Sequence, residues 1–246
     1  MIKPGRLIMK GVRRMQLRVA ERRVLVVGDS HAKIFRNYRF LFGLPRVHFH
    51  ISAKGGATAS GLATPNSKTQ AYQRFRKALD EIPRDLVIVQ LGEVDTGYVI
   101  WYRAKKYSAS VEEMFDLSIK TYTDFLMEIA ATDQVLVISA PLPTIADGND
   151  WGEVADQRKE VVTTQKERTD LTVKFNKRVE EFCKEHGMGY LNLDAECMGP
   201  DGIVSDYYMN PNPLDHHYHE PRYIKLLCRR LNEWFADQPR GAARTD

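Results

Sequence analysis

The stretch RRVLVVGDSHAKIFRNYRFLFGL, residues 22–44, decides how the rest of the chain is interpreted. It begins with a short apolar run, stops at the small polar turn Gly28-Asp29-Ser30-His31, and continues with the amphipathic pattern of a helix. A strand that ends in such a turn places the side chains of the turn at the carboxyl edge of a sheet. Open α/β folds bind their ligands at that edge. We therefore expect the functional residues to lie around Ser30.

Short runs rich in Val, Ile and Leu recur along the chain, with helical patterns between them. They are apolar on both faces, which is typical of parallel strands buried between helix layers. The alternating order predicts a three-layer α/β/α sandwich with a five-stranded parallel sheet, a flavodoxin-like arrangement. The expected strands are residues 24–27, 47–51, 86–91, 135–139 and 190–193, and the expected helices are 31–42, 69–82, 110–131, 166–186 and 221–235. The long connections 53–68, 96–109, 142–165 and 194–219 are expected to meet at one rim of the sheet.

The length of 246 residues fits one domain, which we place at residues 23–238. A basic arm, residues 1–22, precedes this domain, and a short tail, residues 239–246, follows it. The first 23 residues carry eight Lys or Arg and one Glu, a charge of +7 within a total of +4, so the remainder carries −3. A slightly acidic domain is poor evidence for nucleic-acid binding, and we expect no nucleic-acid partner.

Several classes of protein are disfavoured by the sequence. No stretch approaches the roughly 18 apolar residues that span a bilayer, and the first 23 residues lack the continuous apolar core of a secretory signal. The three cysteines are too far apart for a CxxC metal pair and do not form a disulfide framework. We therefore expect a cytoplasmic protein with reduced thiols and no membrane span, while its oligomeric state stays open.

A serine at a strand end is a nucleophile only if a base can reach it, because a hydroxyl is barely ionised at neutral pH. The histidine-dense stretch NPLDHHYHEPRY, residues 212–223, supplies candidates just before the last expected helix. Asp215 lies within five residues of His216, His217 and His219, so a carboxylate and an imidazole come from one loop. Folded over the sheet rim, this loop would complete a Ser-His-Asp arrangement with Ser30.

Two blocks resemble a known family, the SGNH (GDSL-type) hydrolases, which are α/β/α esterases and deacylases. VLVVGDSH, residues 24–31, resembles the strand and GDS signature of the family, and GGATASGL, residues 55–62, resembles its glycine turn. The resemblance extends over about residues 24–235. It implies that Ser30 is the nucleophile and that the backbone N–H groups of Ser30 and Gly56 form the oxyanion hole.

The third block departs from the family pattern. Where the family has Gly-x-Asn-Asp, this chain has Gly92-Glu93-Val94-Asp95, so the asparagine that would be the third oxyanion donor is Val94. The loss of one such donor costs roughly 3 kcal/mol of transition-state stabilisation if nothing replaces it.

The last block departs as well, because the usual Asp-x-x-His is absent. Tyr223 resembles the aromatic residue that opens the last helix of the family. Counting back from it, the base falls best on His217, with Asp215 two residues before it. His216 and His219 are second choices.

These residues predict a serine-dependent ester hydrolase that works through an acyl-enzyme on Ser30 and acts on a short acyl group of a polar carrier such as a sugar. We expect Asp29, Glu93 and Asp95 to bind such a small-molecule substrate, Glu93 and Asp95 from an acidic rim, and Trp101 to stack on it. Two alternatives stay open: an acyltransferase that uses the same serine, and a non-catalytic binding module with the same fold.

The histidine cluster has a second interpretation as a metal site, because imidazoles with a carboxylate suit zinc. However, no HExxH pattern is present, and the adjacent His216 and His217 are not easily directed at one ion. We therefore expect neither a metal nor a cofactor.

Overall fold

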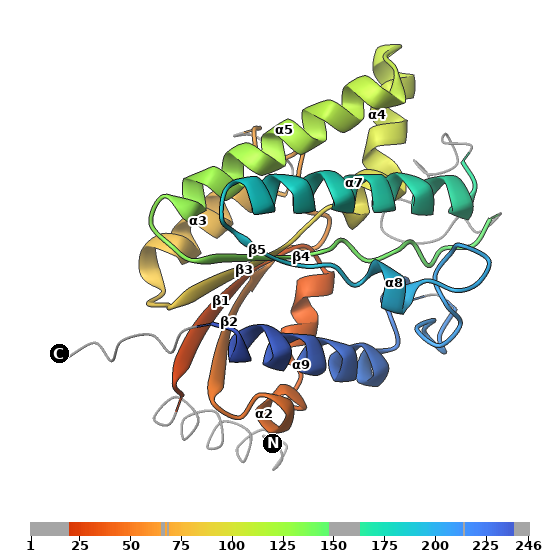
Figure 1. Ribbon diagram of the computed structural model, residues 1–246. Coiled ribbons are helices and arrows are strands. Elements are labelled where there is room, and N and C mark those ends of the chain that lie inside the picture. Colours follow the sequence, from red (N-terminus) through yellow and green to blue (C-terminus); the bar gives the residue numbers. More distant parts are fainter. Residues whose placement is uncertain (1–19, 65–66, 68, 148–162, 214, 239–246) are drawn as a thin grey trace, which may run out of the picture.

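A five-stranded parallel sheet forms the centre of the protein (Figure 1). The computed structural model describes residues 20–64, 67, 69–147, 163–213 and 215–238. Nearly all of the expected arm and the whole of the expected tail lie outside these residues. The strand order is β2-β1-β3-β4-β5, and each neighbouring pair is parallel. The strands are β1 (Arg22–Gly28), β2 (Val47–Ala53), β3 (Leu86–Gln90), β4 (Val135–Ile138) and β5 (Gly189–Leu191).

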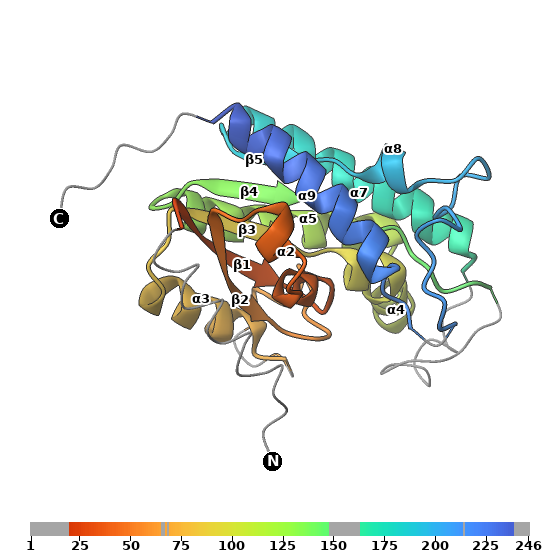
Figure 2. The same ribbon diagram turned by 90° about the horizontal axis from the view of Figure 1, so that it is seen from below.

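Helices cover both faces of the sheet, which confirms the predicted α/β/α fold (Figures 1 and 2). Successive residues of β1 point to opposite faces, as the pleat of a strand requires. Val24 and Val26 join a buried cluster with η1, α2 and α9. Leu25 and Val27 join the cluster on the other face, with α3, α5 and α7.

The helical elements follow the strands in the expected order. They are η1 (His31–Arg36), α2 (Phe40–Gly43), α3 (Ala71–Glu81), η2 (Asp95–Val99), α4 (Ile100–Tyr107), α5 (Val111–Ala130), α7 (Gln165–Glu185), α8 (Asp194–Cys197) and α9 (Glu220–Ala236). The two longest, α5 and α7, each begin with a capping box, Ser110 with Glu113 and Thr164 with Glu167. Such a box pairs orphan backbone donors at the helix start.

Two segments differ from the prediction. The expected helix over residues 31–42 is divided into η1 and α2, because Asn37 is extended and its side-chain oxygen accepts a hydrogen bond from the backbone of Arg39. An asparagine that bonds its own backbone in this way competes with the helix. The expected connection 96–109 is instead mostly helical, as η2 and α4, and the buried Ile100 and Ala104 at helical spacing were the available signal.

The carboxyl ends of β2, β1 and β3 meet at one level, where Gly28 pairs with Ala53 of β2 and Gln90 of β3. A Cβ at Gly28 would come within 2.3 Å of the carbonyl oxygen of Gln90, so only glycine fits there. The turn that carries Ser30 therefore starts from a closely packed edge.

No helix in the described part of the chain is long and apolar enough to cross a bilayer.

Candidate active site

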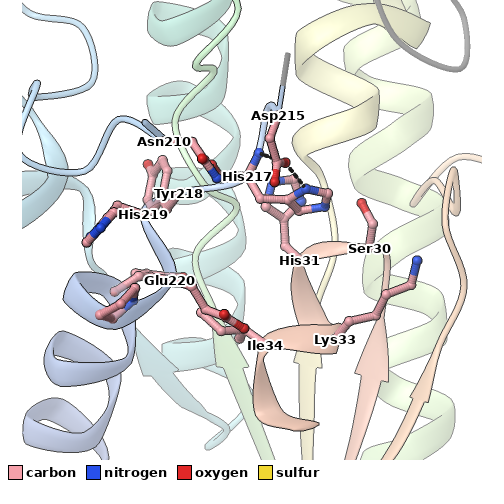
Figure 3. A pocket seen from close by; sticks show the side chains of 12 residues that line it. Ser30, His31, Lys33, Ile34, Asn210, Asp215, His217, Tyr218, His219 and Glu220 are labelled. Carbon is pink, nitrogen blue, oxygen red and sulfur yellow. Dashed lines mark hydrogen bonds and ion pairs between the residues drawn. The ribbon is translucent and has the colours of Figure 1, made fainter. Parts of the chain in front are cut away.

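Ser30 follows β1 directly and precedes the first residue of η1. Serine is a common helix cap, but the side chain of Ser30 makes no capping hydrogen bond to η1. Its hydroxyl group is therefore not used to hold the turn. The residue is half-buried and lines a pocket of about 440 Å³ (Figure 3).

The histidine-dense loop forms the opposite wall of this pocket, as the sequence predicted. Three contacts hold it over the sheet rim. Tyr218 Oη accepts a hydrogen bond from the backbone N–H of Leu142 at 2.7 Å, and Thr144 Oγ1 donates to the carbonyl of His216 at 2.6 Å. At the start of α9, Tyr223 Oη accepts from the amide of Gln90, the last residue of β3, at 3.0 Å. The loop is thus anchored to the ends of β3 and β4.

Asp215 and His217 form a tight pair in this loop. One carboxylate oxygen of Asp215 lies 2.7 Å from Nδ1 of His217 and also accepts its backbone N–H at 3.0 Å. This contact assigns the proton to Nδ1 and leaves Nε2 as the basic nitrogen. Nε2 is buried and has no hydrogen-bond partner among the described residues.

The charges around the pair favour a neutral imidazole. Burial lowers the pKa of His217, and the nearby His31 lowers it further, against the opposite effect of Asp215. Burial would raise the pKa of Asp215, but its hydrogen bonds from His217 outweigh burial and lower it. An ionised carboxylate beside a neutral imidazole is the resting state that a general base needs.

Ser30 and His217 lie in the same pocket but are not hydrogen-bonded to each other, since Nε2 has no partner in the described chain. Figure 3 shows Ser30 beside the adjoining rings of His31 and His217. Catalytic hydrogen bonds are often long in a protein without substrate and tighten in the reacting complex.

The other two candidate bases occupy different positions. The ring of His216 lies 4.2 Å from that of His217, centroid to centroid, and His216 is half-buried. His219 lines the pocket at the start of α9, on the side away from Ser30 in Figure 3, and its Nδ1 is buried without a partner in the described chain. The short contact between Nδ1 and the Asp215 carboxylate is seen at His217, so His217 stays the preferred base.

His31 is a member of the site that the sequence analysis missed. It is buried, and its ring lies 4.7 Å from that of His217. Its Nδ1 and its backbone N–H both contact one carboxylate oxygen of Asp29, at 3.2 and 2.8 Å. Burial lowers the pKa of His31, but the charge and hydrogen bond of Asp29, together with the charge of Glu93, outweigh burial and raise it.

Asp29 and Asp95 are buried inside the protein. This corrects the prediction that both bind substrate and that Asp95 does so from the rim. Asp29 is fully buried beneath His31. Asp95 is also fully buried, and it accepts the backbone N–H groups of Ala59 and Ser60 and the hydroxyls of Ser60 and Ser118. Burial raises the pKa of Asp95 even though these hydrogen bonds oppose the shift. Its role is to hold the loop after β2.

Glu93 and Trp101 also do not occupy the rim positions that were predicted for them. Glu93 is buried, and its charge acts on both His31 and His217, so it lies near the two imidazoles. Trp101 lies on α4, where its indole nitrogen donates to the carbonyl of Thr96 at 2.7 Å. Neither residue lines the pocket.

Gly56 lies in the turn after β2, with φ of +69°, a conformation that glycine adopts without strain. Because β1 and β2 are paired up to Gly28 and Ala53, Ser30 and Gly56 follow neighbouring strands at the same sheet edge. Val94 lies just before η2, and its side chain has no polar atom with which to donate. The expected oxyanion hole therefore stays a prediction with two backbone donors.

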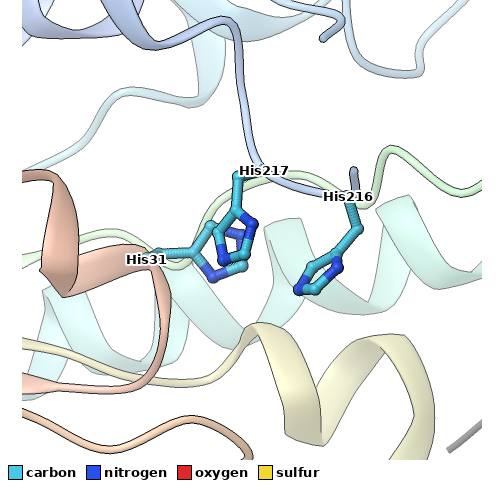
Figure 4. Close-up of side chains that lie close together, drawn as sticks. All are labelled: His31, His216 and His217. Atoms are coloured by element: carbon cyan, nitrogen blue, oxygen red, sulfur yellow. The ribbon is translucent and has the colours of Figure 1, made fainter. Parts of the chain in front are cut away.

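Three histidine rings lie close together beside the pocket, a grouping that the sequence did not predict. His31, His216 and His217 each present one ring nitrogen, and these nitrogens lie within 4.8 Å of one another (Figure 4). The adjacent His216 and His217 therefore each bring a ring nitrogen to a common point. This differs from the expectation that the two rings are not easily directed at one ion.

The fold matches solved structures of GDSL-type proteins. A GDSL-like lipase from Bacteroides thetaiotaomicron aligns with a TM-score of 0.57 at 16% identity, over 92% of this chain and 96% of that protein. An acetyl xylan esterase aligns with a TM-score of 0.52 at 11% identity, over 88% of this chain and 100% of that protein. No protein-family model matches the sequence, and no curated protein matches it significantly. The likeness confirms the expected fold, and the chemistry is argued from the site itself.

Proposed function

We propose that the protein is a serine esterase in which Ser30 is the nucleophile, His217 the general base and Asp215 the residue that orients it. One observation carries this proposal: the Asp215–His217 pair leaves Nε2 of His217 without a hydrogen-bond partner among the described residues, and His217 lines the same pocket as Ser30, whose hydroxyl does not cap η1. A nucleophile, a base and an orienting carboxylate are the three parts that acyl transfer to serine requires.

The reaction proceeds in two halves. Ser30 Oγ attacks the ester carbonyl while His217 Nε2 takes its proton, and the collapsing intermediate expels the alcohol, which receives that proton. Water then attacks the acyl-serine with His217 again as base, which releases the acid and restores Ser30. The N–H groups of Ser30 and Gly56 stabilise the oxyanion in both halves.

The pocket favours a small substrate with polar groups. Its volume of about 440 Å³ lies near the lower end of ordinary ligand pockets, and its lining includes Lys33, Asn210 and Glu220 beside Ile34 and Tyr218. A short acyl group on a polar carrier such as a sugar fits this mixture better than a long lipid chain. Asp95 is buried and does not contribute an acidic group to the rim. An acceptor alcohol in place of water would make the same site an acyltransferase.

A non-catalytic binding module is the second candidate, and Val94 favours it. Without the side-chain donor at this position, the site relies on backbone groups alone to stabilise the oxyanion. Such a module would keep the pocket and the Asp215–His217 pair but would not activate Ser30.

A fluorophosphonate probe, which reacts with activated serines, separates the two candidates. We expect one adduct on the wild-type protein, located on Ser30 by peptide mapping, and none on Ser30→Ala. Ser108→Ala is the matched control, because Ser108 is exposed at the end of α4, and it should be labelled like the wild type. A folded wild-type protein that takes no adduct would favour the binding module. Screening of acetylated sugars and longer acyl esters would then test the preferred substrate.

A further inference from the structure

We propose that His31, His216 and His217 together form a binding site for one divalent transition-metal ion of the zinc type. The three ring nitrogens that face one another lie within 4.8 Å, and they come from two distant parts of the chain, the start of η1 and the loop before α9 (Figure 4). Three imidazoles with an open fourth position are a common zinc environment.

Two of the three rings are already oriented as metal ligands. Nδ1 of His31 contacts Asp29, and Nδ1 of His217 contacts Asp215, so in both rings Nε2 is the nitrogen left to bind an ion. A carboxylate behind a ligating histidine is the usual outer contact of protein zinc sites, where it holds the ring and strengthens the ligand. Nε2 of His217 is also buried without a partner in the described chain, which a metal bond would satisfy.

The local charge favours a cation at this point. Asp29 is fully buried, Glu93 is nearly so, and Asp215 adjoins His217. The second carboxylate oxygen of Asp29 has no partner among the described residues. Because a buried carboxylate needs a positive counter-charge, a dication beside these side chains would be stabilised rather than repelled.

The rings need only a small adjustment. Tetrahedral zinc with bonds of about 2.0–2.1 Å places its ligand nitrogens about 3.3 Å apart. His216 is the half-buried member on a loop, so rotation of its side chain is the simplest way to close the remaining distance. His31, packed at the sheet edge, provides the fixed side of the site.

Occupation of this site would oppose the serine chemistry, a consequence that rests on the proposed function. A metal on His217 Nε2 takes the lone pair that would accept the proton of Ser30. The same imidazole therefore has two exclusive uses, and the ion acts as a reversible inhibitor of Ser30.

The binding itself is tested on the full chain, freed of metal by a chelator and titrated with Zn²⁺ alone by calorimetry. We expect one ion per chain, and at least a tenfold weaker affinity in His216→Gln and in His31→Gln. His186→Gln is the matched control, because His186 is an exposed histidine at the end of α7, and its affinity should equal that of the wild type. Circular dichroism checks the fold, and the partly exposed His216 keeps the test valid if the buried His31 variant does not fold. Absence of stoichiometric binding, or unchanged binding in His216→Gln, would overturn the proposal.

The competition is tested by the rate of fluorophosphonate labelling at Ser30 with excess Zn²⁺ or with chelator. We expect Zn²⁺ to slow labelling of the wild type at least tenfold relative to the same protein with chelator, and to slow labelling of His216→Gln far less relative to its own rate with chelator. Equal slowing of the two proteins, or faster labelling with Zn²⁺, would contradict the competition. If the wild type is never labelled, the proposed esterase fails, while the calorimetric titration still decides whether the metal site exists.

Discussion

Two Asp-x-His pairs face each other across the pocket, and they differ in their surroundings. In both, one carboxylate oxygen contacts Nδ1 and the backbone N–H of the histidine two residues later. The side chains of Asp29 and His31 are 0% and 3% exposed at the sheet edge, whereas those of Asp215 and His217 are 40% and 35% exposed in a loop. The same local geometry is therefore built once into the core and once at the surface.

The consequence is that the pKa values of the two imidazoles are shifted in opposite directions. Burial lowers the pKa of His31, but the charge and hydrogen bond of Asp29, together with the charges of Glu93 and Asp215, outweigh burial and raise it, whereas burial and the neighbouring His31 lower the pKa of His217. A short sequence motif thus does not determine the direction in which the pKa of its histidine is shifted. The environment decides it, because charge interactions strengthen as solvent is excluded.

The largest effect is expected from Asp215→Asn in the surface pair. An amide cannot hold the Nδ1 proton of His217 as a carboxylate does, so labelling of Ser30 should slow by about 10³-fold or more. The free energy of unfolding should change by less than about 1 kcal/mol, since the pair is more than one-third exposed. Kinetics of probe labelling and urea unfolding measure the two quantities. A large loss of stability with unchanged labelling would show that Asp215 is structural.

Asp29→Asn, in the buried pair, should lower the free energy of unfolding more than it slows the labelling of Ser30. It removes a charge-assisted hydrogen bond from a fully buried site, which typically costs about 2–3 kcal/mol of stability. Urea unfolding of this variant, compared with Asp215→Asn, measures the contrast directly. Equal destabilisation by the two variants would remove the distinction drawn between the pairs.

Asp194 is another buried carboxylate, and its side-chain hydrogen bond comes from an amide, Asn176, rather than from an imidazole. Burial raises its pKa to about 7, although Asn176 donates to it at 2.8 Å. The folded state therefore holds the proton more tightly than the unfolded state. The resulting stabilisation is complete below about pH 4 and is lost as the pH rises to about 7.

Between pH 5 and pH 8 this loss should amount to about 2 kcal/mol. The measurement is the pH dependence of urea unfolding for the wild type and for Asp194→Asn, because the difference between the curves isolates this group from the histidines. Parallel curves would mean that Asp194 does not titrate in this range.

The smallest effect is expected from Val94→Asn, which restores the residue type of the family pattern at the third oxyanion position. If its amide reaches the oxyanion, labelling of Ser30 should accelerate about tenfold, below the 10²–10³ of an optimised donor. Val94→Leu is the control for a change of side-chain size, and its labelling rate should not rise. A Val94→Asn variant that labels no faster would place the side chain away from the reacting atoms.

The strands were predictable from sequence because each is a short run rich in apolar residues, and the ends of β1 and β2 fell within two residues of the prediction. The pairing of Asp215 with His217 was predictable because it is local. His31 was missed, although Asp29 and His31 show the same Asp-x-His spacing as the loop pair. That repeated spacing was the available signal.

The burial of Asp95 was not predictable in the same way. An acidic residue after a strand is ordinarily expected at the surface, and only the fold brings the N–H groups of Ala59 and Ser60 and the hydroxyl of Ser118 to its carboxylate. Its donors lie 23 to 36 residues away in the chain, so no local pattern reveals them.

The sequence by itself determined the layered α/β/α order, the position of Ser30 at a strand end and the Asp215–His217 pair, because all three depend on periodicity and near neighbours. Only the tertiary structure decided that Asp29 and Asp95 are buried, and that His31 joins two histidines from a loop more than 180 residues away. Burial and convergence depend on which distant segments the sheet brings together, and they set the direction of each imidazole's pKa shift and the possibility of a shared ion.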